Sequence, residues 1–346
     1  MLTTLALIIG ISTSFFAVLL GYLGSFNIVS LVALVALSNI AQWLLAPYLI
    51  KMLYRVKTAQ PLEYGELHST LALLSRRSGI KKPKLGIASM PIANAFAYGS
   101  PLSGNHVVVT SALLDTLKDG EVEAVLGHEI GHLKHRDVQV MMLVSFLPSL
   151  IYLLGRTMLY SSYVGNNRSG RGSGVAGLIG TVSMALYFVL TLFTLRLSRL
   201  REYYADRHSS SIVEDGPRKL SEGLAKIISE NHPGSQGPGR QKQWSFKALF
   251  ISDPGASGID KVSGSPMLGP DQGLVEHYIN REITRVERIM EIFSTHPNIT
   301  KRLTALRSLK FSMGDDALII RNELDGDDSY NFPVKVQRKS KGDEMK

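Results

Sequence analysis

The first fifty residues of this chain contain no Lys, Arg, Asp or Glu, and the first charged side chain is Lys51. Residues 2–23 and 28–50 are two apolar runs within this segment. Each is long enough to cross a bilayer, which takes about 20 residues in an α-helix. No basic residue precedes the first run, and the second run follows after a short turn. The pattern therefore favours a membrane hairpin over a cleaved signal peptide.

Basic residues follow the second run directly, at Lys51, Arg55 and Lys57. The positive-inside rule places this end of the run, and the domain after it, in the cytoplasm. We therefore interpret the net charge of +9 as membrane flanking and contact with anionic lipid rather than as a nucleic-acid surface. The expected partners include the lipid bilayer and no nucleic acid. The chain is expected to be an integral, multi-pass protein of the plasma membrane.

Two further apolar stretches, residues 138–154 and 175–195, interrupt a chain of otherwise soluble composition. We predict a second membrane helix pair over 138–195, and the alternative is a pair of buried core helices. The flanking segments, 51–137 and 196–310, are predicted to form one domain outside the bilayer.

Strand patterns occur at residues 84–90 and 106–110. The predicted fold is thus a mainly α membrane protein with a small β-sheet and four membrane helices. Residues 231–272 are dense in Gly, Pro and Ser, and we predict a flexible loop there. Residues 311–346 are predicted to be a C-terminal extension.

A possible metal site lies between the two membrane regions, at His128 and His132. These residues are four apart on a predicted helix, so both imidazoles project from one face and can bind one Zn²⁺ at about 2.0–2.1 Å. Glu129 stands where its carboxylate can take a proton from a water on the metal. This H-E-x-x-H pattern is typical of zinc peptidases. The alternative is two surface or capping histidines.

The site needs a third protein ligand, and the chain has no Cys to supply a thiolate. His135 shares the helix face but lies too far along the axis, so we interpret it as a surface residue or as one that supports a ligand from behind. Glu202 is the better candidate. Asp206 lies one helical turn further on, where it can accept a hydrogen bond from a ligand imidazole. The alternative for Glu202 and Asp206 is a solvated acidic helix face.

The sequence resembles the HtpX family of membrane metalloproteases, which are relatives of the CAAX prenyl endopeptidases. The residues that carry the resemblance run in order along the chain: Asn94-Ala95-Phe96, Val107-Val108-Val109-Thr110, Leu113-Leu114, Val125 to His132, Asp137, Arg201 to Asp206, and Thr295-His296-Pro297. The resemblance implies a zincin-type catalytic domain with one Zn²⁺ per chain. It also implies a cytoplasm-facing active site that degrades damaged or misfolded membrane proteins.

The resemblance implies further roles outside the zinc helix. His296 and Arg302 have the spacing of a His-Pro element and an Arg that lie near the reacting carbonyl in related proteases, so we assign them to stabilising the oxyanion. The alternative is a His and an Arg at the start of a helix. The edge strand that would bind an extended substrate by strand addition comprises Asn94, Val107, Val108, Val109 and Thr110.

Three other functions remain as hypotheses. A membrane metal-transport protein would need ionisable residues inside its spans, and the first two apolar runs have none. A catalytically silent scaffold would not need Glu129. Within the enzyme class, a CAAX-type processing protease is the nearest alternative to a zinc metalloendopeptidase that acts on unfolded or membrane-protein polypeptides.

Overall fold

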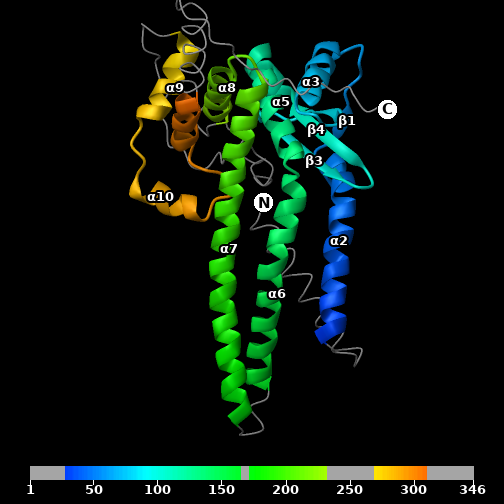
Figure 1. Cartoon of the computed structure of the whole chain (residues 1–346), viewed down its shortest axis with the longest axis vertical. Helices are drawn as coiled ribbons and strands as arrows, with labels where there is room; N and C mark the ends of the chain where they lie inside the picture. Colours follow the sequence, from blue (N-terminus) through cyan, green and yellow to red (C-terminus); the bar gives the residue numbers. More distant parts are fainter. Residues whose placement is uncertain (1–27, 165–170, 232–268, 310–346) are drawn as a thin grey trace, which may run out of the picture.

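The computed structural model describes residues 28–164, 171–231 and 269–309. A polar head of short helices and one sheet stands at one end of three long helices (Figure 1). The helices are α2 (Ile28–Leu53), α3 (Gly65–Arg77), α4 (Ser111–Thr116), α5 (Asp119–Lys134), α6 (Asp137–Val164), α7 (Arg171–Ile212), α8 (Gly216–Glu230), α9 (Pro270–Asn280) and α10 (Arg285–Ile292). A last helix covers residues 299–309.

The sheet has four strands, in the order β1-β2-β4-β3, and is mixed. The strands are β1 (Val56–Thr58), β2 (Lys84–Ala88), β3 (Ala95–Ser100) and β4 (Gly104–Thr110). β4 pairs in parallel with β2 and antiparallel with β3. Its three consecutive valines are fully buried, as expected of a strand with neighbours on both sides.

This strand order corrects the predicted substrate-binding strand. Residues 107–110 lie in β4, whose two edges are already hydrogen-bonded to β2 and β3. The outer edge on this side of the sheet belongs to β3, which begins directly after Asn94 and was not among the predicted strands. The sequence of β3, Ala-Phe-Ala-Tyr-Gly-Ser, contains no Val or Ile, so its strand pattern is weak.

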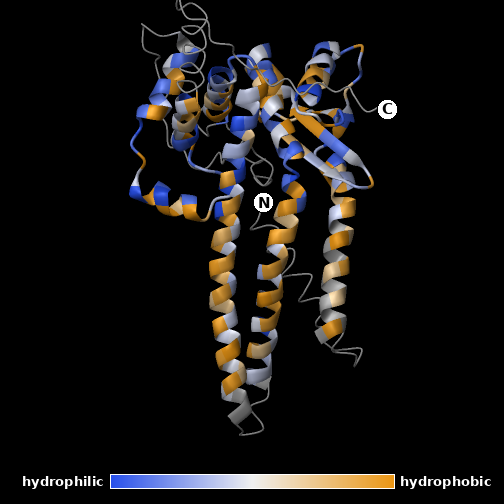
Figure 2. Ribbon diagram, viewed as in Figure 1, coloured by the Kyte–Doolittle hydropathy of each residue, from blue (hydrophilic) through white to orange (hydrophobic). Residues whose placement is uncertain are grey.

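Among the described residues, two helices are long and apolar enough to cross a membrane: residues 137–163 of α6 and 174–212 of α7. They run side by side away from the head, and the orange of apolar residues covers them in Figure 2. α7 has 42 residues, or about 63 Å at 1.5 Å per residue, which is twice the thickness of a bilayer core. The apolar part of α7 ends near Leu195, and the rest of the helix continues into the head without a break.

The predicted mainly helical fold with a small sheet is therefore confirmed, but the count of four membrane helices is not. α2 begins at Ile28 and is apolar, whereas the preceding run, residues 2–23, lies outside the described residues. The prediction that the loop reaches residue 272 is wrong, because α9 begins at Pro270. The rest of that loop, 232–268, and the C-terminal extension also lie outside the described residues.

The core of the head surrounds α5. Leu126 and Ile130 of this helix are fully buried, as are Leu113 of α4 and Leu224 of α8. Each such side chain contributes about 1.5–3 kcal/mol through removal from water. α5 is thus fixed on several sides, which gives the His128 and His132 side chains a rigid support.

Candidate metal centre

The first half of the centre comes from α5. The Glu121 side chain accepts a hydrogen bond from the backbone N–H of Lys118 at 2.9 Å and so caps the start of the helix. His128 and His132 lie one turn apart on the inner face of α5. Their Nε2 atoms are 3.1 Å apart and their rings meet edge to face. The predicted convergence of these two side chains is thus present in the structure.

The second half comes from α7, which crosses α5 at close range because α5 has glycines at the contact. A Cβ on Gly131 would lie 3.0 Å from Ala205 Cα, and one on Gly127 would lie 2.9 Å from Ser209 Oγ. This approach brings the buried carboxylate of Glu202 to both histidines. Its oxygens lie 3.6 Å from His128 Nε2 and 3.7 Å from His132 Nε2.

The other nitrogen of each imidazole faces a carboxylate. His128 Nδ1 lies 2.9 Å from Asp206 Oδ1, and His132 Nδ1 lies 2.6 Å from Asp137 Oδ2. A carboxylate accepts, so His132 Nδ1 donates to Asp137, whereas His128 Nδ1 lies at ion-pair distance from Asp206 without the geometry of a hydrogen bond. In the metal-free protein one proton between the two Nε2 atoms, 3.1 Å apart, relieves the repulsion of their lone pairs, and a metal ion would take its place. The arrangement therefore fits a metal ion.

The spacing of the three side chains fits the same conclusion. One ligand atom from each of His128, His132 and Glu202 lies within 4.8 Å of the others. Ligand atoms at the corners of a tetrahedron around Zn²⁺ are about 3.3–3.4 Å apart when each bond is about 2.0–2.1 Å. The separations of 3.1, 3.6 and 3.7 Å lie close to that value. Two imidazoles and a carboxylate are also a donor set that zinc accepts.

The sequence of residues 61–310 matches Peptidase family M48. The chain belongs to peptidase family M48. Proteins named Protease HtpX homolog from Aeropyrum pernix, Thermoplasma acidophilum and Archaeoglobus fulgidus are 39%, 34% and 31% identical to it over 82%, 79% and 88% of this chain. The matched parts cover 87%, 83% and 84% of those proteins. The resemblance to the HtpX family is confirmed.

A solved structure gives the fold of this M48 chain a precedent. The crystal structure of S. mikatae Ste24p matches it with a TM-score of 0.54 over 88% of this chain and 64% of that protein, at 17% sequence identity. The chain thus spans a little under two thirds of Ste24p, and the likeness concerns the fold. Together with the HtpX relatives and the two apolar helices, the family assignment makes this protein a membrane metallopeptidase.

Arg302 lies deeper in the M48 centre than we predicted. It is 1% exposed, and its Nε and Nη2 donate to the two oxygens of Asp206 at 2.9 and 2.6 Å. Its Nη1 lies 3.2 Å from Glu202 Oε2. Arg302 is not among the residues that line the adjacent cleft, and its assignment to the oxyanion stays a prediction. The structure shows the contacts by which the guanidinium holds Asp206 and Glu202.

The charges of this network shift several pKa values in the absence of a metal. Burial alone would lower the pKa of His128, but the adjacent carboxylates of Asp206 and Glu202 raise it to about 9. Burial and the adjacent His128 lower the pKa of His132. Burial opposes ionisation of Glu202, but its neighbours, led by His296, hold its pKa well below the usual value.

The metal centre opens into a cleft of about 220 Å³. Glu129 and His296 both line it, and His296 Nδ1 lies 3.2 Å from Glu202 Oε1. The edge strand β3 forms another part of the wall. The apolar part comes mainly from α2, β3 and α6, through Trp43, Pro47, Ile50, Phe96 and Met141.

Two residues of the centre have roles that the sequence interpretation missed. Asp137 was noted only as part of the resemblance, yet it holds His132. Arg201 pairs with Asp137 and also donates to the backbone oxygen of His135 at 2.8 Å. The available signal was a carboxylate placed just beyond the end of the zinc helix. His135 itself lies against His208 and Tyr204, apart from the ligand group, as expected of a residue that is not a ligand.

Proposed function

We propose that this chain is a zinc-dependent endopeptidase that hydrolyses unfolded or damaged membrane proteins on the cytoplasmic side of the plasma membrane. One observation carries the proposal: His128, His132 and Glu202 converge at ligand distance, and Glu129 lines the cleft beside them. A single ion per chain would be held by those three side chains. The peptidase domain would comprise residues 51–137 and 196–310.

Zn²⁺ bound there would lower the pKa of water to about 7 and polarise the scissile carbonyl. In this proposal Glu129 takes the proton of the attacking water and passes it to the leaving amine nitrogen. Asp206 and Asp137 keep each imidazole in the tautomer whose Nε2 faces the ion. His296, which lies beside Glu202, donates a hydrogen bond to the oxygen of the scissile carbonyl, which gains negative charge during the attack.

The substrate would bind to β3 rather than to β4. β3 is the sheet edge that lines the cleft, and Glu129 lines the same cleft. An extended polypeptide that adds to this edge gains main-chain hydrogen bonds independent of its side chains. Such binding suits a protease that removes unfolded proteins, because it demands an exposed backbone more than a particular sequence.

The cytoplasmic orientation is supported by basic residues at the head end of the long helices. Lys51 lies in the last turn of α2, Arg136 precedes α6, and Arg196 follows the apolar part of α7. Figure 2 shows the same change from orange helices to a largely blue head. The positive-inside rule assigns such an end to the cytoplasm. A protease of this orientation meets membrane proteins as they emerge from the bilayer.

A CAAX-type processing protease is the second candidate, and one observation favours it. The cleft has an apolar wall that includes Trp43 and Ile50 of α2, next to the membrane region, where a prenyl chain could bind. Comparison of kcat/KM for a prenylated CAAX peptide and for an unfolded membrane protein separates the two. Preference for the prenylated peptide would favour processing over degradation.

The test of the proposed chemistry is Glu129→Gln in the purified full chain. We expect proteolysis of casein or a membrane protein to fall by about 10²–10⁴-fold, the usual contribution of general acid–base catalysis, while one zinc per chain remains bound. Glu123→Gln is the matched control, because Glu123 lies on the same helix and pairs with Lys219 outside the cleft. Equal cleavage by the Glu129 variant and wild type would remove the general-base assignment.

A further inference from the structure

α10 exposes its apolar side to the surroundings. Val286, Ile289, Met290 and Phe293 follow the i, i+3, i+4, i+7 spacing of one helix face. Their exposed fractions are 65%, 58%, 52% and 52%, and no residue of α10 is buried. A surface helix of a soluble domain normally turns such a face inward. The face therefore needs an apolar occupant from outside the described chain.

The polar side of α10 faces the protein instead. Glu287 pairs with Arg281, and Glu291 pairs with Lys301 and accepts a hydrogen bond from the backbone N–H of Asn298 at 3.2 Å. Both glutamates are partly buried, whereas the apolar residues beside them are exposed. The helix is thus anchored through its charges, and this contact fixes the direction in which its apolar side points.

Arg199 of α7 fixes the end of α10. Its Nη1 lies 2.7 Å from Glu291 O, 3.1 Å from Ile292 O and 2.7 Å from Ser294 O. A cation suits the negative end of a helix, where the last carbonyls lack partners within the helix. α10 consequently lies across α7 at the height where the apolar part of α7 ends (Figure 1).

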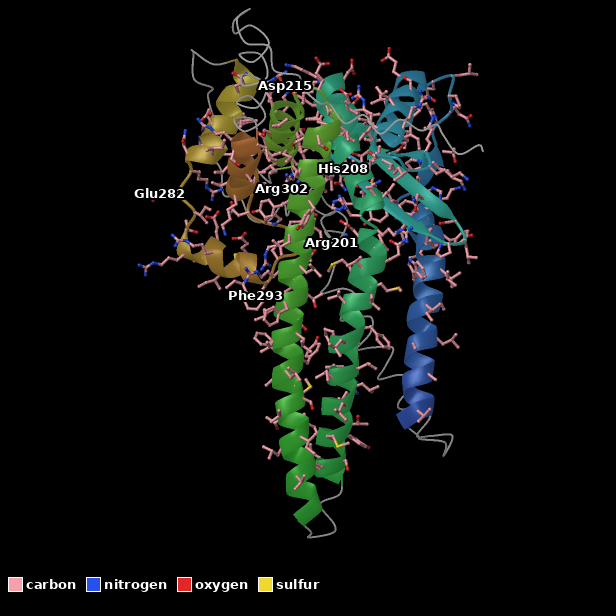
Figure 3. All side chains as sticks on the ribbon, in the orientation of Figure 1. Arg201, His208, Asp215, Glu282, Phe293 and Arg302 are labelled. Atoms are coloured by element: carbon pink, nitrogen blue, oxygen red, sulfur yellow. The ribbon has the colours of Figure 1, made fainter. Side chains whose placement is uncertain are left out.

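The apolar side of α10 is continuous with the apolar surface of α7. The rings of Phe293 and Phe188 are 6.5 Å apart, and Phe193 of α7 is also exposed. Figure 3 shows Phe293 beside α7, further along the span than Arg201 and Arg302. Arg285 and Arg288 are exposed on α10 itself, where they can meet lipid phosphates.

We propose that α10 is an interfacial helix that lies in the bilayer spanned by α6 and α7, with Val286, Ile289, Met290 and Phe293 among the upper acyl chains. The occupant of the apolar face is phospholipid, and anionic headgroups meet Arg285 and Arg288. This proposal rests on the membrane embedding that is part of the proposed function. Because Ser294 and His296 follow α10 directly, the bilayer surface also fixes the segment that leads to His296.

The chain has no cysteine, so a nitroxide spin label can be placed at single engineered cysteines. We would label Ile289→Cys on the apolar face, Arg288→Cys as the matched site one residue earlier, and Leu178→Cys on the span of α7. Each carries Glu129→Gln to prevent self-cleavage, and the full chain is reconstituted in vesicles that contain anionic phospholipid. Collision rates with oxygen, which concentrates in lipid, and with a water-soluble nickel complex report the surroundings of each label.

We expect the label at 289 to resemble that at 178, with frequent oxygen collisions and loss of nickel collisions, while the label at 288 stays accessible to nickel. Nickel access at 289 with lipid exposure at 178 would overturn the interfacial helix and leave the membrane protease intact. Shielding of 289 from both reagents would overturn it too, because protein would then cover the face. Nickel access at 178 would contradict the membrane embedding itself.

Discussion

At the metal centre, each of the two ligand imidazoles faces a carboxylate that an arginine holds in turn. Asp206 faces His128 on one side and Arg302 on the other, and Asp137 stands in the same way between His132 and Arg201. The H-E-x-x-H spacing predicts the two imidazoles because both lie on one helix. It says nothing of Arg302, which reaches Asp206 only after a separate helix packs beside α7.

Removal of the Arg302 side chain tests this support. Arg302→Ala leaves the buried carboxylates of Asp206 and Glu202 without their guanidinium, and breaking a buried pair in this way costs about 3–5 kcal/mol. We expect a lower thermal unfolding temperature of the metal-free protein in detergent. Arg302→Lys keeps the charge but not the two parallel hydrogen bonds, so we expect it to lower the unfolding temperature less than Arg302→Ala does. Equal stability of the alanine variant and wild type would contradict the arrangement.

The raised pKa of His128 predicts that metal binding releases a proton. Below its pKa of about 9, metal-free His128 is protonated, and an ion can bind only after that proton leaves. We therefore expect release of about one proton at pH 7, and an affinity that falls about tenfold for each pH unit below 9. Calorimetry in buffers of different ionisation enthalpy measures this release. Unchanged affinity between pH 7 and 9 would count against it.

At the scale of elements, the crossing of α5 and α7 brings the ligands together. Periodicity and apolar content predict helix in both regions, but the sequence interpretation ended the second membrane helix pair at residue 195 and assigned residues 196–310 to the domain outside the bilayer. The structure instead has one unbroken α7, because its polar end packs on α5 as its apolar end packs on α6. β3 was missed for a similar reason, since its pairing with β4 outweighs a weak local pattern.

Gly131→Ala tests the crossing directly. The added Cβ would lie 3.0 Å from Ala205 Cα, which is backbone and cannot swing aside, so α7 must move away with Glu202. We expect zinc affinity to fall at least about tenfold, a change of about 1.4 kcal/mol. Gly223→Ala in α8 is the control, because its nearest neighbour would be 3.5 Å away, an ordinary contact. Equal zinc affinity of the two variants, measured with a competing chelator, would show that α7 tolerates the methyl group.

At the scale of the whole molecule, the head is closed by charges that join elements distant in sequence. Asp271 of α9 lies 2.5 Å from Lys118, which precedes α5, and 3.0 Å from Lys226 of α8. α9 follows residues 232–268, so this contact returns the chain to the head. The pairing could not be predicted from sequence, because residues 231–272 have the composition of a loop throughout.

The Asp271 contact predicts a dependence of stability on pH. Partial burial opposes ionisation, but hydrogen bonds from Lys118 and Lys226 lower the pKa of Asp271 below its usual value. The contact therefore contributes its full stabilisation at pH values above about 3.9, the pKa of Asp in the unfolded chain. This stabilisation is lost as the pH falls through the lower pKa that Asp271 has in the folded protein. Because the carboxylate is partly exposed, the effect should stay under about 1 kcal/mol.

Asp271→Asn checks that prediction in metal-free protein. The variant should be slightly less stable than wild type at pH 7, and the difference should vanish at a pH below both pKa values. Thermal unfolding followed by circular dichroism at the two pH values measures this. A difference that persists or grows in acid would assign the effect to packing rather than to charge.

The most direct measurement of the central claim is the position of the metal in a crystal of the Glu129→Gln protein, from anomalous diffraction at the zinc absorption edge. We predict one anomalous peak per chain, about 2.0–2.2 Å from His128 Nε2, His132 Nε2 and a Glu202 carboxylate oxygen. A zinc-loaded crystal with no peak between these side chains, or with Glu202 turned away from the ion, would contradict it.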